Sequence, residues 1–216
     1  FLDGVNNLDI DASTYGQLIL MNSENVTVSS FEGMGNFVPL HLYSCKNVNV
    51  SDYYVENVYS GLKIFYSEFC NIENFNVDTA ESNGIHIMYS SNITLSNCQV
   101  SFDGYYGIYV YQSSDCVISD AIVWNSTNTG IRMEYSDSCI VDNFIGYYCP
   151  IAMYLQGSDS CNVTNSGFFN NTRGLVVSSS TNNLFYLNEF GDNSDQNAVD
   201  NAAGNSWDNG TIGNAW

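Results

Sequence analysis

The residues of this chain best suited to chemistry fall at related positions in a repeated sequence. Both histidines, His41 and His86, and two of the four basic residues, Lys63 and Arg132, share one place in their repeats. Glu134 follows two residues after Arg132. Histidine, arginine and glutamate are side chains that transfer protons or stabilise charge. Any binding or catalytic site is therefore expected where these scarce residues gather.

The elements that position them are set by a unit of 22 or 23 residues that recurs eight times. Two apolar residues alternate with polar or aromatic ones at the start of each unit, which predicts a strand with one buried face. Two further apolar clusters in each unit predict two more strands. The first inward position is occupied in turn by Leu18, Leu40, Leu62, Ile85, Ile108, Ile131, Met153 and Leu175. A repeat of this length indicates a solenoid, here a parallel β-helix.

Small and turn-forming residues also recur in register. Glycine precedes the first inward position in five units (Gly61, Gly84, Gly107, Gly130 and Gly174), which predicts a corner with positive φ or a tight bend. Serine or cysteine recurs five positions after the first inward residue of each unit, and Asn or Asp recurs twelve positions after that residue. Because like residues stack between coils about 4.8 Å apart, we expect these columns to form ladders of hydrogen-bonded side chains. The two columns are Ser23, Cys45, Ser67, Ser90, Ser113, Ser136, Ser158 and Ser180, and Asp52, Asn74, Asn97, Asp120, Asn143 and Asn165.

The repeated motif GIxVxxSxxCxI followed by Asn resembles the parallel β-helix repeat of NosD-like and pectate-lyase-like proteins. The final segment WDNGTIGNAW, Trp207 to Trp216, resembles the one that ends such arrays in archaeal NosD-like cell-surface proteins. The resemblance covers nearly the whole chain. It implies an all-β, right-handed parallel β-helix of about eight to nine coils with three short sheets and no helices. It does not single out an activity, because the family includes lyases, hydrolases, epimerases and non-catalytic surface proteins.

The same pattern predicts one domain over residues 1–216, with a partial first coil at 1–16, regular coils at 17–190 and an irregular segment at 191–216. Two arrangements of that last segment stay open. Either it folds over the last coil through Trp207 and Trp216, or the chain belongs to a longer array whose coils continue beyond it.

Charge and hydropathy exclude several partners. The net charge of −19 with only four basic residues argues against nucleic-acid binding and against docking on anionic membranes. No apolar run is long enough to insert into a membrane. Seven Asn-X-Ser/Thr sequons indicate a secreted or cell-surface glycoprotein, although a chain rich in Asn, Ser and Thr also produces sequons by chance. They begin at Asn25, Asn49, Asn92, Asn125, Asn162, Asn170 and Asn209.

The outward residues of the first strand form what we call the aromatic strip. Flat aromatic rings with a few cations can stack on sugar rings, so the strip is a candidate site for acidic or neutral glycan. Sheet surfaces also favour Tyr and Phe, so packing against a second copy of the chain stays open. The strip comprises His41, Tyr43, Lys63, Phe65, His86, Met88, Tyr109, Tyr111, Arg132 and Tyr154.

Catalysis on the same face is the alternative function. The resemblance implies that a lyase would use Arg132 or Lys63 as base beside a calcium ion held by carboxylates, but Glu134 is the only acid in the two outward columns. A glycoside hydrolase needs paired carboxylates, and Asp103 is the residue that could join His86 and Glu134. The leading prediction is a secreted or cell-surface protein with a structural, assembly or glycan-binding role, which uses the strip and the open ends of the solenoid and no cofactor. A polysaccharide lyase or glycoside hydrolase is the alternative.

Three cysteines, Cys116, Cys139 and Cys161, fall in one inward column, and Cys70 occupies the same column two coils earlier. The spacing between coils would permit a disulfide. We expect reduced, buried thiols instead, because Val and Ile fill the same column elsewhere. The copper link that the NosD resemblance implies is not favoured here, since an inward cysteine column offers no histidine or carboxylate beside it. We therefore predict no metal site.

Overall fold

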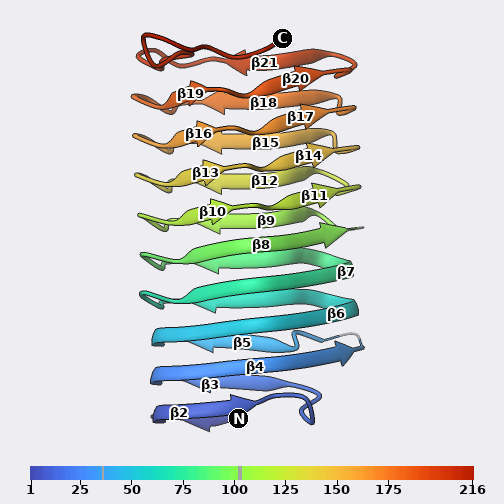
Figure 1. The fold of residues 1–216 in the computed structure, drawn as a ribbon, viewed down its shortest axis with the longest axis vertical. Coiled ribbons are helices and arrows are strands. Elements are labelled where there is room, and N and C mark those ends of the chain that lie inside the picture. Colours follow the sequence, from blue (N-terminus) through green and yellow to red (C-terminus); the bar gives the residue numbers. More distant parts are fainter. Residues whose placement is uncertain (36, 102–103) are drawn as a thin grey trace.

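A computed structural model describes residues 1–35, 37–101 and 104–216. Its secondary structure is entirely β, wound into a parallel solenoid of about nine turns. Figure 1 shows the coils stacked along one axis from the N-terminus to the C-terminus. The predicted β-helix is confirmed. No helix that could span a membrane occurs in the described ranges.

The strands of the first sheet carry the aromatic strip. They are β1 (Leu2–Asp3), β3 (Leu18–Met21), β5 (Leu40–Tyr43), the ends of β6 (Lys46–Phe65) and β7 (Asn71–Met88), β9 (Tyr106–Tyr111), β12 (Thr129–Glu134), β15 (Ile151–Gln156), β18 (Arg173–Ser178) and β21 (Gln196–Asp200).

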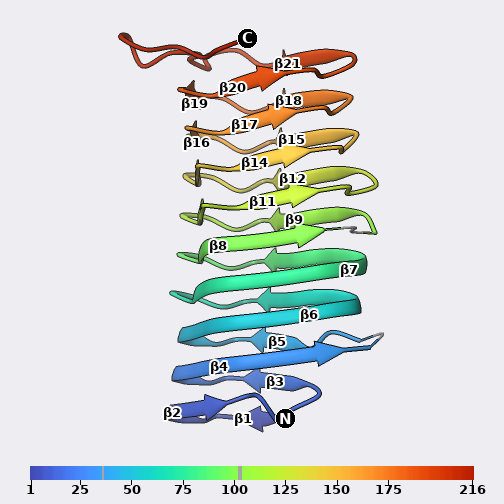
Figure 2. The same ribbon diagram turned by 45° about the vertical axis from the view of Figure 1, so that its right-hand side comes forward.

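The second and third sheets close each coil. In the N-terminal half the second sheet begins with β2 (Asn6–Asp11), and single strands then run around the corner between the two sheets, namely β4 (Glu24–Met34), the earlier parts of β6 and β7, and β8 (Thr94–Ser101). In the C-terminal half the second sheet holds β10 (Val117–Ser119), β13 (Ile140–Asp142), β16 (Asn162–Thr164) and β19 (Leu184–Tyr186), and the third holds β11 (Ile122–Trp124), β14 (Ile145–Tyr147), β17 (Gly167–Phe169) and β20 (Glu189–Gly191). Figure 2 turns the side with β11, β14 and β17 toward the viewer.

The register follows the repeat. Leu18 pairs with Leu40, Leu40 with Leu62 and Leu62 with Ile85, all in parallel. These inward residues are fully buried. Each such side chain contributes roughly 1.5–3 kcal/mol when it leaves water. The single core therefore runs the length of the solenoid and holds every coil in place.

Asn and Asp build the corners as predicted. All six residues of the position-twelve column have left-handed backbone, with φ between 51° and 55°. Their side chains form a partial ladder: Asn74 donates to Asp52 at 3.0 Å and Asn143 to Asp120 at 2.7 Å. Asn165 departs from it and donates to Asp142. Asn and Asp tolerate this conformation because their short polar side chains bond locally.

The serine column is hydrogen-bonded in a different way from the prediction. Its hydroxyls do not bond one another. The Ser90 hydroxyl accepts the backbone N–H of Ser67 in the preceding coil at 3.1 Å and donates to the carbonyl of Met88 at 2.8 Å. The side chain thus satisfies a buried backbone donor where the strand turns the corner and the ladder of backbone bonds is interrupted.

The five corner glycines are a second correction. None of them has positive φ. A Cβ on Gly61 would lie 2.6 Å from the carbonyl oxygen of Gly84, and one on Gly130 would lie 2.5 Å from that of Ala152. At Gly61, Gly130 and Gly174 the next coil approaches too closely for a side chain, so close packing and not positive φ favours glycine there.

The C-terminal segment packs on the last coil through its two tryptophans. Trp207 packs on Phe185 with ring centroids 4.6 Å apart, and Trp216 stacks on Phe190 at 4.8 Å. All seven cysteines are buried, and the column thiols of Cys70, Cys116, Cys139 and Cys161 form no disulfide, as expected. Burial raises the pKa of the Cys70 and Cys98 thiols to about 12, so they stay protonated at neutral pH.

The serine column yields a test of stability. The hydroxyl of Ser158 accepts the N–H of Ser136 at 3.0 Å and is fully buried. Ser158→Ala leaves that N–H without a partner and should lower the free energy of unfolding by roughly 1–3 kcal/mol in urea titrations. The control is Ser119→Ala on the outer face of β10, whose hydroxyl bonds nothing in the described ranges. It should change stability by less than about 0.5 kcal/mol. Equal effects of the two changes would contradict this role.

Candidate functional site

The first sheet places all ten residues of the aromatic strip on one outward face, each half-buried. The strand pairing runs from His41 to Lys63, His86, Tyr109, Arg132 and Tyr154. The strip is therefore continuous across six coils. His86 and Arg132 lie two coils apart, with Tyr109 between them. Asp103 lies outside the described residues.

Aromatic rings pack tightly at the histidine end of the strip. Phe65 meets His41 edge-on at 5.3 Å and His86 at 5.1 Å, and His86 stacks on Tyr109 at 4.9 Å. Burial and the Lys63 charge lower the pKa of His86 to about 4, and lower that of His41 as well. Both rings are neutral at pH 7, and their Nε2 atoms are buried without a hydrogen-bond partner. At this end the strip presents flat, uncharged rings beside one ammonium group.

At the other end Arg132 is clamped between two tyrosines. Its guanidinium lies 5.4 Å from the Tyr106 ring centre and 4.5 Å from that of Tyr154. It donates to the Glu134 carboxylate and, at 2.7 Å, to Oε1 of Gln156. Stacking and ion pairing hold the guanidinium in one orientation.

Glu134 also accepts a hydrogen bond from the Tyr109 hydroxyl. Burial alone would raise the pKa of Glu134, but the donors Arg132 and Tyr109 outweigh it and hold the pKa below its usual value. Burial raises the pKa of Tyr106 to about 12, and raises that of Tyr109. The cluster thus contains one neutralised ion pair and two neutral phenols. It suits orientation of a polar ligand better than donation of a proton.

The repeat pattern did not predict a further column of outward side chains. Tyr66, Tyr89, Gln112 and Tyr135 follow the strip directly, and we call them the tyrosine row. Alternation along the strand would turn this position inward, but its backbone is left-handed, with φ between 46° and 54°. That corner places the tyrosine row beside the strip: Tyr89 meets Tyr111 at 5.7 Å. The recurrence of tyrosine at one position of the repeat was the signal that could have revealed it.

The tyrosine row is costly for the backbone. A left-handed residue with a Cβ is disfavoured by roughly 1–2 kcal/mol, and the other coils use Asn22, Ser44, Gly157 and Ser179 here. The tyrosines gain little burial in return, since Tyr66, Tyr89 and Tyr135 are 51%, 41% and 54% exposed. Neither local preference nor core packing accounts for three large rings at this position.

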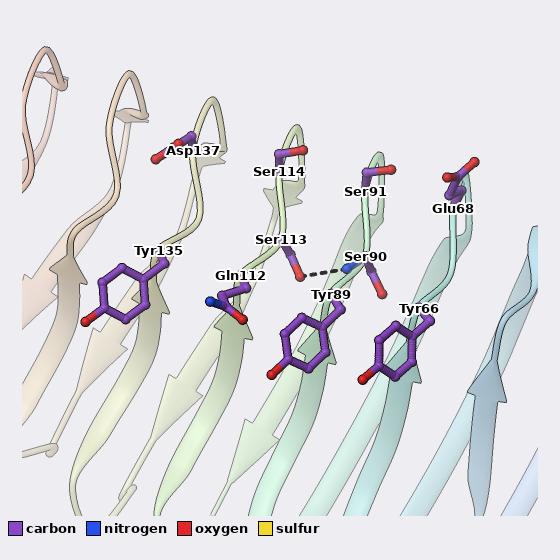
Figure 3. Close-up of a pocket in the computed structure, with 10 residues that line it drawn as sticks. All are labelled: Tyr66, Glu68, Tyr89, Ser90, Ser91, Gln112, Ser113, Ser114, Tyr135 and Asp137. Atoms are coloured by element: carbon purple, nitrogen blue, oxygen red, sulfur yellow. Dashed lines mark hydrogen bonds between the residues drawn. The ribbon is translucent and has the colours of Figure 1, made fainter.

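The tyrosine row forms one wall of a groove of about 570 Å³ (Figure 3). The rings of Tyr66 and Tyr89 lie parallel, with centroids 5.0 Å apart and 12° between planes. Ser90 and Ser113 lie between the walls. The opposite wall is formed by Glu68, Ser91, Ser114 and Asp137, one from each of four successive coils. The groove thus offers ring faces on one side and hydroxyls and carboxylates on the other.

This architecture defines the class, the parallel β-helix proteins. Structures similar in fold include tailspike protein 2 of bacteriophage CBA120 (TM-score 0.65, 13% identity), the Streptococcus pneumoniae surface protein and adhesin PfbA (0.61, 13%) and a tailspike protein of E. coli bacteriophage HK620 solved with a hexasaccharide (0.62, 9%). The chain is covered over 88%, 96% and 88% of its length, against 35%, 74% and 43% of theirs. It thus spans about a third of the CBA120 tailspike domain. No curated protein matches the chain.

Within this class the chain can also be assigned to a family. The family described as "Periplasmic copper-binding protein (NosD)" matches residues 17–216, and the chain belongs to the NosD family.

The residues present do not fit a copper ion. The column thiols donate to backbone carbonyls, Cys116 to Ser114 at 3.5 Å and Cys139 to Asp137 at 3.4 Å, so they carry the protons that a metal would displace. They are also closed to solvent. In the ranges 1–35, 37–101 and 104–216 no three His, Cys, Asp or Glu side chains converge as metal ligands, for copper or for calcium.

The histidines predict a dependence of stability on pH. In the unfolded chain His86 has its ordinary pKa of 6.5 and takes up a proton below about that pH. In the folded protein the pKa of His86 is lowered to about 4, so the same ring stays neutral until the pH approaches 4. The unfolded state therefore binds more protons in this window, and the free energy of unfolding should fall as the pH is lowered through it. His86→Phe keeps an aromatic ring and removes the titration. Urea unfolding between pH 7 and 4.5 should give a shallower slope for this variant. Parallel curves would contradict the neutral, buried state of His86.

Proposed function

We propose that this protein binds glycan at an extracellular or cell-surface location, through the aromatic strip and the groove beside it. The tyrosine row is the observation that carries the proposal. Three large exposed rings occupy left-handed positions that Asn, Ser or Gly fill elsewhere at lower cost. Backbone strain that is not repaid by packing is typical of functional positions.

The chemistry of the groove suits a sugar chain. A ring face of tyrosine can pack against the C–H face of a pyranose, and Tyr66 and Tyr89, which stack on each other one coil apart, keep about half of their surface exposed for such contacts. The Ser91 and Ser114 hydroxyls opposite can donate to and accept from sugar hydroxyls. Because the walls repeat from coil to coil, the groove suits an extended oligosaccharide lying along the solenoid axis. Binding of this kind requires no metal or cofactor.

The charges favour a neutral glycan in the groove. Glu68 and Asp137 line it, and no basic side chain does so in the described ranges. Lys46 offsets part of this charge from 3.8 Å beyond Glu68. An anionic sugar would be repelled there. On the strip, Arg132 is already paired with Glu134, which leaves Lys63 as its unpaired cation in the described part of the chain.

Two further observations support the proposal. The HK620 tailspike of similar fold was solved with a hexasaccharide, and PfbA is described as a surface adhesin. The net charge of −19 opposes close association of copies through this face. It therefore weighs against the strip as a self-association surface.

The sequons fit the same arrangement. Asn25, Asn49, Asn92 and Asn162 lie along the second sheet or its corners, and Asn125 and Asn170 at the corner after the third. All except Asn125, which is half-buried, are exposed. N-linked glycans at Asn125, Asn170 and Asn209 would leave the strip uncovered, whereas Asn92 directly follows Ser91 in the groove wall.

The tyrosine row gives the test. Tyr89→Asn removes a stacking ring and replaces it with a residue suited to φ of 51°. On an array of neutral and acidic glycans, followed by calorimetry with the neutral oligosaccharides that bind, we expect affinity to fall roughly tenfold or more, a loss of about 1.4 kcal/mol. The free energy of unfolding should stay within about 1 kcal/mol of the parent, since relief of strain offsets the lost ring contacts.

A matched control is Tyr148→Asn. Tyr148 is also left-handed, with φ of 56°, and is 58% exposed, but it lies outside the groove. It should leave affinity unchanged. Equal affinity of the parent and Tyr89→Asn would overturn the proposal. A dimer in native mass spectrometry that Tyr89→Asn dissociates would establish the self-association alternative in its place.

A further inference from the structure

A separate hollow of about 310 Å³ lies on the outer face of the third sheet, away from the strip. The pairing of Tyr54 with Asn76, Asn76 with Gln99 and Gln99 with Ile122 shows that it crosses four successive coils. Tyr54 borders one end, and Trp124, which follows Ile122 on β11, borders the other. None of its residues belongs to the strip or to the groove.

The two ends of the hollow are aromatic walls. Trp124 stacks on Tyr147 of the next coil, with centroids 5.9 Å apart and 4° between planes, so one ring face is supported and the other borders the hollow. Tyr54 is 42% exposed and its hydroxyl donates to Glu56 at 3.2 Å. A tryptophan supported on one face and an exposed tyrosine at the other end are two aromatic surfaces that suit a ring-shaped ligand.

The floor between the walls is polar and has spare hydrogen-bonding capacity. The side-chain amides of Asn76 and Gln99 bond no other group in the described part of the chain. Asp78 accepts from the Ser101 hydroxyl at 2.8 Å and keeps its second oxygen available. Each amide offers two donors and one acceptor, which matches a ligand that carries many hydroxyls.

The charges around the hollow limit the class of ligand that can bind there. Asp78 lines the hollow, Glu56 borders it through Tyr54, and no basic side chain lines it in the described ranges. A phosphate, sulfate or uronate would be repelled, whereas a neutral sugar chain would meet ring faces at its ends and amides along its middle.

We infer that this hollow is a second binding site for neutral oligosaccharide, so that one chain holds two glycans on two different sheets. The inference rests on the proposed function, because it assigns the same class of ligand. Figures 1 and 2 show the first and third sheets as separate faces of each coil. A molecule with sites on both faces would bridge neighbouring polysaccharide chains.

The test uses the full chain and four neutral probes. These are the hexasaccharides of cellulose, xylan, mannan and chitin. Native mass spectrometry and calorimetry should give two bound oligosaccharides per chain. Trp124→Ala should leave one, and so should the double variant Asn76→Ala, Gln99→Ala, whose amides bond nothing within the described fold. Tyr89→Asn should also leave one. The variant that combines Tyr89→Asn with Trp124→Ala should bind none.

The outcomes separate the two proposals. One site in the parent, lost in Tyr89→Asn and untouched by Trp124→Ala and by the amide double variant, would overturn the second site and leave the groove. One site lost in the hollow variants and untouched by Tyr89→Asn would overturn the groove and keep the hollow. Absence of binding by every probe to the parent would overturn both. Beads coated with the bound oligosaccharide should agglutinate with the parent and not with either single-site variant.

Discussion

Backbone hydrogen bonds between successive coils are the interaction on which the rest of this structure depends. They join each strand to its counterpart in the next coil in parallel and in register, 18 residues away in the first coil and 22 or 23 residues away in the regular coils. A residue therefore shares its surroundings with its counterparts above and below. An apolar column becomes a core, a serine column becomes a row of acceptors for buried N–H groups, and an outward aromatic column becomes a continuous surface.

The same bonding must be interrupted wherever the chain turns from one sheet to the next. The protein meets this requirement with left-handed residues, and at most corners it uses Asn, Asp or Ser, whose side chains suit that backbone. The tyrosine row is an exception, because tyrosine does not favour the left-handed backbone that the corner imposes. Phe69, Tyr148 and Leu187 are further bulky residues at left-handed corners, but they stand singly in their columns. Only at the groove do such residues line up over neighbouring coils and enclose a hollow.

The fold and its register were predictable because the period is nearly constant and the inner face tolerates only apolar side chains. Leu62 and Ile85 could be placed opposite one another from their spacing alone. The strip was predictable for the same reason, since alternation along a strand fixes which residues face outward. Alternation stops at the strand end, however, and so Tyr66 and Tyr89 were missed. The ion pair of Arg132 with Glu134 and the partners of the serine hydroxyls depend on rotamers and corner geometry that a one-dimensional pattern does not contain.

Each coil contacts little beyond its two neighbours, and this has a consequence for how such a surface can change. The walls of the groove come from four coils, each of which supplies one residue to either side. Duplication or loss of one complete unit would lengthen or shorten the groove by one rung, while the flanking rungs kept their shape. The binding face is in this sense modular in length. Its reach along a polymer can be altered in whole steps, by genetic events that leave the core intact.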